Sequence, residues 1–168
     1  RPHMRGFHFA WLTFFIAFFC WFAMTPLLSE IARSLDLTRK EIWTSNTLAV
    51  AGSAVTRILA GPVNDIYGAR YTMCGTLLVS AIPTCIAGAL IRGTTSLYII
   101  RLFIGICGSA FVTCQFWTTS LFVAEVAGTA NSLAAGWGHL GGGVAQVAMG
   151  SLLFPHLTVM SGGSGFGQ

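Results

Sequence analysis

Residues Phe7–Leu28 read FHFAWLTFFIAFFCWFAMTPLL, a run with no lysine, arginine, aspartate or glutamate. A helix rises about 1.5 Å per residue, so about 20 apolar residues in a row are enough to cross the hydrocarbon of a bilayer. The stretch therefore predicts a transmembrane helix that ends near Pro26.

Further runs of similar length follow this first one. The expected helices lie at about 7–28, 43–63, 71–91, 97–119 and 127–153. Short connections between spanning helices force neighbours to alternate in direction. The sequence thus predicts an all-α membrane protein whose bundle of about five transmembrane helices fills 7–154. An N-terminal tail at 1–6 precedes the bundle, and the polar Gly/Ser-rich tail at 155–168 looks like a truncation or join.

The composition agrees with a membrane environment. Apolar residues make up 54% of the chain, charged residues only 8%, and the mean hydropathy is +0.73. Soluble domains carry roughly 25% charged residues. The net charge of +4 is scattered, and its densest basic group, Arg33, Arg39 and Lys40, is interleaved with acids. Such a segment is typical of a solvated loop, so we expect no nucleic-acid partner.

The cysteines and histidines give no sign of catalysis. Five cysteines lie in apolar runs without a C-x-x-C spacing, which favours neither a disulfide framework nor a zinc site. The four histidines lack a metal-ligand spacing, and no acid lies inside a predicted span. We therefore expect no enzyme, no metal and no cofactor.

Arg57 is the most informative single residue, because it lies well inside the second predicted helix. A charge near the bilayer centre costs about 2.5–3.5 kcal/mol on insertion scales and usually serves a function. One alternative is that Arg57 extends its side chain to the interface, which is about six residues away along the helix. Another is an ion pair with a carboxylate. An anion-binding role is the hypothesis that we favour.

Three predicted helices carry a face of polar or small residues at helical spacing. These residues are Asn46, Ser53, Arg57 and Asn64 on the second helix; Gly108, Phe111, Gln115 and Thr118 on the fourth; and Asn131, Ala135, His139, Gly142 and Gln146 on the fifth. Such residues can line a substrate path, or they can simply hydrogen-bond neighbouring helices together.

The fifth helix is also rich in glycine. Glycines in a membrane helix allow another helix or a ligand to come very close. The expected packing positions are Gly136, Gly138, Gly141, Gly142 and Gly143.

The segment Gly61-Pro-Val-Asn-Asp65-Ile-Tyr-Gly68-Ala-Arg70 reads as a polar loop after the second helix, in which Arg70 can pair with Asp65 or with a neighbouring helix. Its Gly61, Asp65, Gly68 and Arg70 match G-x-x-x-D-x-x-G-x-R, the signature of the major facilitator superfamily. The stretch from Gly128 to Gly143 resembles the nitrate signature of the nitrate/nitrite porter family, especially in eukaryotic members. His139 stands where that family usually has asparagine.

The resemblance implies a carrier of twelve helices in two halves, of which this chain is the N-terminal portion. It implies that Arg57 binds the anion, that Phe111 packs against it, and that His139 helps to line the site. Gln115 and Asn131 are further candidate substrate-binding residues. A planar guanidinium suits a planar monoanion, because its fork of donors fits two oxygens. Neutral His139 could donate one hydrogen bond, as asparagine would, while a protonated ring would add charge.

The expected partners are nitrate or nitrite, membrane lipid and the missing C-terminal half. The expected location is multi-pass in the plasma membrane, with the segment from Asp65 to Arg70 in the cytosol. Two alternatives stay open: a carrier for another small anion, and a small oligomeric channel or carrier subunit complete at this length.

Overall fold

The computed structural model describes residues 2–153, and the expected tail at 155–168 lies outside this range. Its elements are helices with short connections. They are α1 (Pro2–Ala23), α2 (Leu28–Ser34), α3 (Arg39–Tyr67), α4 (Ala69–Leu90), α5 (Thr94–Ile104), the 3-10 turn η1 (Gly105–Ser109), α6 (Ala110–Leu121), α7 (Ala124–Val147) and the π-helical end η2 (Ala148–Leu153).

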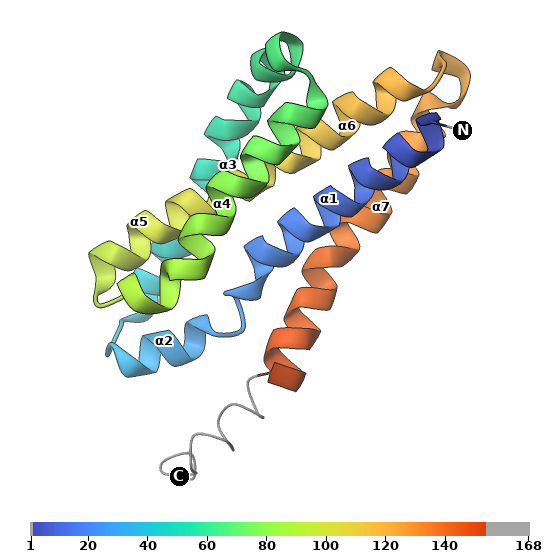
Figure 1. Cartoon of the computed structure of the whole chain (residues 1–168). Helices are drawn as coiled ribbons and strands as arrows, with labels where there is room; N and C mark the ends of the chain where they lie inside the picture. The colour runs from blue at the N-terminus through green and yellow to red at the C-terminus, as the bar shows by residue number, and fades with distance from the viewer. Residues whose placement is uncertain (1, 154–168) are drawn as a thin grey trace.

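The long helices alternate in direction and form two closely packed pairs (Figure 1). α1 lies along α7, and this is the most extensive contact between elements in the described part. α3 lies along α5 and η1, and α4 packs across α5 and α6. Because helices of one direction pair with each other in both cases, residues far apart in the sequence meet at the same depth of the bundle.

The second expected helix is longer than the sequence indicated. α3 begins at Arg39, where the Thr38 side chain and Glu41 form a capping box, and it runs to Tyr67. Most of the segment that we expected as a loop is therefore helical, including Gly61, Pro62 and Asp65. The chain turns only at Gly68, whose φ of +79° is a conformation that a residue with a side chain rarely adopts. α4 follows at once.

The connection after α1 also differs from the expectation. α1 ends at Ala23, before Pro26, and the short helix α2 fills part of the segment that we read as a solvated loop. Charged residues of that segment, among them Arg33 and Asp36, are exposed.

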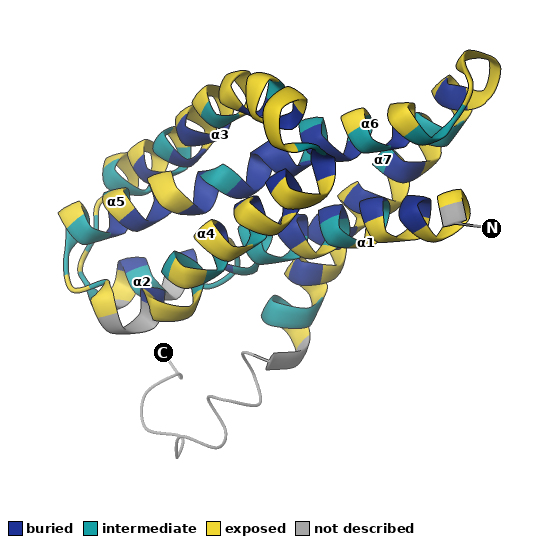
Figure 2. Ribbon diagram, turned by 45° about the horizontal axis from the view of Figure 1, so that its top comes forward, coloured by how far each residue is buried: buried dark blue, intermediate teal, exposed yellow. Residues whose placement is uncertain are grey.

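The apolar surface identifies the environment of the bundle. Many large apolar side chains face outward, with Ile58, Ile66 and Leu78 between 67% and 76% exposed. Figure 2 shows exposed positions along the outer faces of α3 and α4 and buried positions where helices meet. Among the described residues, two helical stretches are long and apolar enough by themselves to cross a membrane, His3–Ala23 and Thr94–Leu121. The second is α5, η1 and α6 read as one rod.

The core sits between α1, α4, α6 and α7. It includes Phe7, Phe14, Phe18, Met73, Cys107, Cys114 and Ala134. The small residues matter as much as the aromatic ones, because a Cβ at Gly105 would collide with the carbonyl oxygen of Ala49 on α3. The close approach of α3 to η1 thus depends on the missing side chain.

Candidate anion site

Arg57 projects from α3 toward the start of α6. Its Nε donates a hydrogen bond to the carbonyl oxygen of Gly108 at 3.0 Å, and its Cζ lies 5.8 Å from the centre of the Phe111 ring. The side chain is exposed, and no carboxylate pairs with it among the described residues. A guanidinium has five N–H donors, so most of its donors stay available. This placement favours an anion-binding role over an internal ion pair.

Phe111 links Arg57 to His139. Its ring centre lies 5.6 Å from that of His139, whose ring also meets Phe14 at 5.1 Å and Phe18 at 4.9 Å. Three helices therefore bring together a planar cation, a phenyl ring and an imidazole. Flat apolar faces beside a charged group exclude water and strengthen its attraction for an anion.

Gln115 and Asn131 have partners of their own. The Gln115 Nε2 donates to the Asn131 carbonyl oxygen at 3.3 Å, and the Asn131 Nδ2 donates to Thr119 Oγ1 at 2.8 Å. These bonds tie α6 to α7, and none of the described contacts joins either side chain to Arg57 or His139. They match the alternative of hydrogen bonds between helices more closely than direct anion binding.

The glycines of α7 divide into two sets. A Cβ at Gly138, Gly141 or Gly142 would collide with Phe14, the Phe15 backbone or Phe22 of α1. A Cβ at Gly136 or Gly143 would meet nothing within 4 Å. The expectation that all five pack against a neighbour is therefore met at three positions, and the other two face away from the described part.

The signature residues hold a turn and a helix contact. The Arg70 guanidinium lies over the Trp117 ring of α6, with 5.9 Å from Cζ to the ring centre. Asp65 is exposed, and no ion pair joins it to Arg70 in the described part of the chain. Of the two partners considered for Arg70, the neighbouring helix is the one observed.

A second arginine escaped the sequence analysis. Arg101 lies inside the fourth apolar run, is only 3% exposed, and donates from Nη2 to the Asn46 side-chain oxygen. Its Nε and Nη1 have no partner among the described residues. The signal was present, because Arg101 is the charged residue of the run at 97–119. Asn64 completes the polar contacts of α3 by donating to Thr113 Oγ1 at 3.4 Å.

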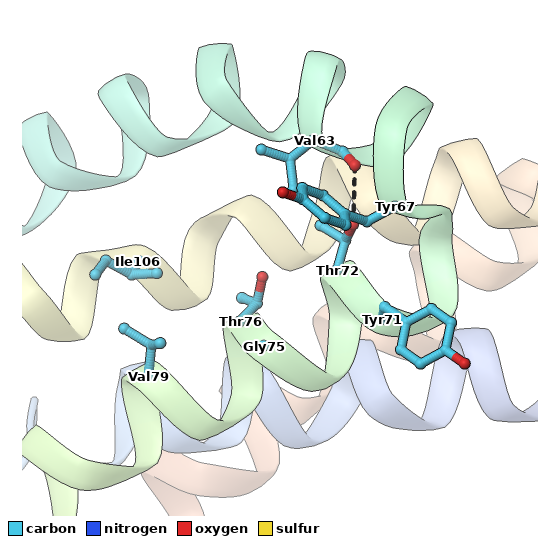
Figure 3. A pocket seen from close by; sticks show the side chains of 8 residues that line it. All are labelled: Val63, Tyr67, Tyr71, Thr72, Gly75, Thr76, Val79 and Ile106. Carbon is cyan, nitrogen blue, oxygen red and sulfur yellow. Dashed lines mark hydrogen bonds between the residues drawn. The ribbon is translucent and has the colours of Figure 1, made fainter.

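The best-defined groove lies elsewhere. It has a volume of about 360 Å³ and is lined by Val63, Tyr67, Tyr71, Thr72, Gly75, Thr76, Val79 and Ile106. Figure 3 shows these side chains around an open, mostly apolar space beside α3 and α4, with Thr72 bonded to the Val63 carbonyl. It contains no charged residue, so it does not explain Arg57 or His139.

Comparison with known proteins places these features in a family context. The family model described as Major Facilitator Superfamily matches residues 10–163. The chain is 39% identical to the high affinity nitrate transporter 2.5 of Arabidopsis thaliana, over 89% of this chain and 30% of that protein. It is 38% identical to nitrate transporter 2.1 of Chlamydomonas reinhardtii, over 89% of this chain and 27% of that protein.

A bacterial relative is similar over a longer stretch. Identity to the nitrate/nitrite transporter NrtP of Nostoc punctiforme is 32%, over 95% of this chain and 32% of that protein. The chain thus spans less than a third of the length of these relatives. No solved structure matches it significantly.

Proposed function

Because the chain belongs to the major facilitator superfamily and groups with the nitrate/nitrite porters within it, we propose that it forms part of a carrier that moves nitrate or nitrite across a membrane. Carriers of this kind work by alternating access, in which two halves rock about a site near the midplane. This chain contributes helices of the N-terminal half. The remaining helices are its partner, and lipid surrounds both.

The observation that carries the proposal is the pairing of Arg57 with Phe111. A buried salt bridge would have satisfied Arg57 internally, but its described bond is to the Gly108 carbonyl oxygen. The guanidinium keeps its charge and most of its donors, and its fork fits two oxygens of a planar anion. The phenyl ring beside it offers a flat face against which such an ion can pack.

His139 contributes the third side of this site from α7. Its ring stacks edge-on against α1 and lies beside Phe111, on the same side of the bundle as the Arg57–Phe111 pair. Gln115 and Asn131 are assigned a supporting role, since they hold α6 and α7 at the separation that sets the Phe111–His139 distance. We place the carrier in the plasma membrane, with the turn at Gly68 in the cytosol.

Uptake of labelled nitrate by liposomes tests the proposal directly. The complete reading frame that contains this chain is purified and reconstituted, and uptake is measured with nitrite, chloride and a dicarboxylate as competitors. We expect saturable uptake that nitrite reduces and the dicarboxylate does not. Transport of the dicarboxylate without transport of nitrate would assign the site to a larger anion instead.

A further inference from the structure

The orientation of the His139 ring fixes where its proton sits. Nδ1 lies 2.7 Å from the carbonyl oxygen of Ala135, one turn earlier on α7. A carbonyl oxygen only accepts hydrogen bonds, so Nδ1 must carry a hydrogen. A neutral imidazole has one N–H, and its other nitrogen is then a bare acceptor. In neutral His139 that acceptor is Nε2.

This finding changes the expectation drawn from the sequence. Neutral His139 was expected to donate a hydrogen bond to the anion, as asparagine would. Its only N–H is used by Ala135, and the lone pair of Nε2 would face an anion that also offers only lone pairs. The neutral ring is therefore a poor partner for nitrate at this position.

The groups around the ring leave Nε2 without a competing partner. α1 contributes the rings of Phe14 and Phe18, and α6 contributes Phe111. The charged group on this side is Arg57 of α3, beyond the Phe111 ring. His139 is exposed, and Nε2 has no hydrogen bond among the described residues.

We propose that His139 binds the anion only as an imidazolium, so that each nitrate that binds at this site brings one proton from water onto Nε2. The inference rests on the proposed function. In the protonated ring both nitrogens donate, Nδ1 to Ala135 and Nε2 to an anion oxygen, and the ring adds a positive charge opposite Arg57. The proton is released to water when the anion leaves, so the charge of one nitrate is balanced by one proton.

Calorimetry of nitrate binding measures this proton directly. The complete protein is titrated with nitrate at several pH values, each in two buffers of different ionisation enthalpy, which gives the number of protons taken up. On the alkaline side of the imidazole titration we expect about one proton per nitrate and a Kd that weakens about tenfold per pH unit. His139→Asn should bind nitrate with no linked proton and a nearly flat pH profile.

A matched control is the histidine on α1. The Nδ1 of His8 accepts a hydrogen bond from Trp11 Nε1 at 3.0 Å, so its neutral form has the opposite tautomer. His8→Asn should keep the proton uptake of the original protein. If His139→Asn does not fold, nitrogen NMR of labelled histidine answers the same question. His139 should show the Nδ1–H tautomer without nitrate and an imidazolium with saturating nitrate at the same pH.

The outcomes separate the two proposals. Nitrate binding with equal proton uptake in the original protein and in His139→Asn would overturn the inference and leave the transport function standing. A His139 ring that stays neutral in the nitrate complex would also overturn it. Absence of nitrate binding by the original protein would refute the proposed function and, with it, this inference.

Discussion

At the scale of single residues, two arginines in apolar helices have opposite environments. Arg101 is buried and held by Asn46 between α3 and α5, while Arg57 is exposed and bonded only to the Gly108 carbonyl among the described residues. A buried guanidinium that is already held contributes to helix placement. An exposed one with spare donors is free to meet a substrate, which is why the site is built around Arg57.

Replacing Arg57 by lysine keeps the charge but removes the planar fork. Lysine offers a compact point charge that cannot donate two parallel hydrogen bonds to one anion or lie flat beside Phe111. We expect Arg57→Lys to reduce nitrate uptake at least 100-fold, about 2.7 kcal/mol, with normal surface expression. Radiolabel uptake and surface labelling measure both quantities. Arg5→Lys, at the exposed start of α1, is the control, and unchanged uptake by Arg57→Lys would remove Arg57 from the site.

At the scale of helices, α1 and α7 approach so closely because α7 has no side chains at the contact. Gly141 meets the backbone of Phe15, and Gly138 meets the ring of Phe14, which also packs against His139 and Phe111. The same contact therefore sets the position of the anion-site rings.

Adding one methyl group at this contact tests its importance. Gly141→Ala would collide with the Phe15 backbone, which cannot rotate away, so we expect a loss of about 1–3 kcal/mol of stability. Gly143→Ala meets nothing within 4 Å and should be neutral or stabilising, by up to about 1 kcal/mol, because alanine favours the helix. Thermal unfolding in detergent compares the two variants. Equal effects would show that α7 does not pack against α1 in this way.

The starts of α3 and α5 are joined by one carboxylate. Glu41 accepts hydrogen bonds from the Thr38 backbone and hydroxyl and from the Thr94 hydroxyl at 2.9 Å. The Thr38 backbone N–H is the largest of the causes that lower the pKa of Glu41 below its ordinary value, and the two hydroxyls add to it. These bonds favour the ionised form.

The lowered pKa gives the stability a pH dependence with a definite sign. The contribution of Glu41 is complete above its ordinary pKa of 4.5 and is lost as the pH falls through the lowered folded-state value. We therefore expect Glu41→Gln to unfold at lower temperature than the original protein at pH 6–7, with the difference shrinking below pH 4.5. Thermal scans across this range measure it. Glu125→Gln, an exposed glutamate at the start of α7, should not show this change.

At the scale of the whole molecule, the described bundle has a site with only one wall. Arg57, Phe111 and His139 approach one another, yet Arg57 and His139 are both exposed. In a two-halved carrier the opposing helices would cover them and exclude water. The length of the relatives, of which this chain spans less than a third, supports such a partner.

Expressed alone, this chain should insert into membranes but should not transport nitrate. Without an opposing half, Arg57 meets water or lipid instead of a desolvated anion. Three of the five glycines in α7 are covered by α1, so self-association would involve the outer face with Gly136, Trp137 and Gly143. Reconstitution of the purified chain with labelled nitrate tests this. Saturable uptake that Arg57→Ala abolishes would instead support a small carrier built from copies of this chain.

The sequence by itself determined the fold class, the family and the central arginine. Long apolar runs with few charges leave helices in a bilayer as the low-energy solution, and the glycine signatures require close turns and contacts at fixed spacing. A charge at position 57 is costly wherever the helix packs, so its importance is visible without a structure.

Only the tertiary structure decided which polar residues meet. Spacing along one helix shows a shared face, but it does not tell whether that face bonds to a neighbour or lines an open site. Gln115 and Asn131 bond to each other, Arg101 is held by Asn46, and Phe111 lies between Arg57 and His139. The tautomer of His139 depends on a carbonyl brought within 2.7 Å by the turn of its own helix and by the rings that orient it. These are properties of side-chain positions in three dimensions, and no periodicity in the sequence encodes them.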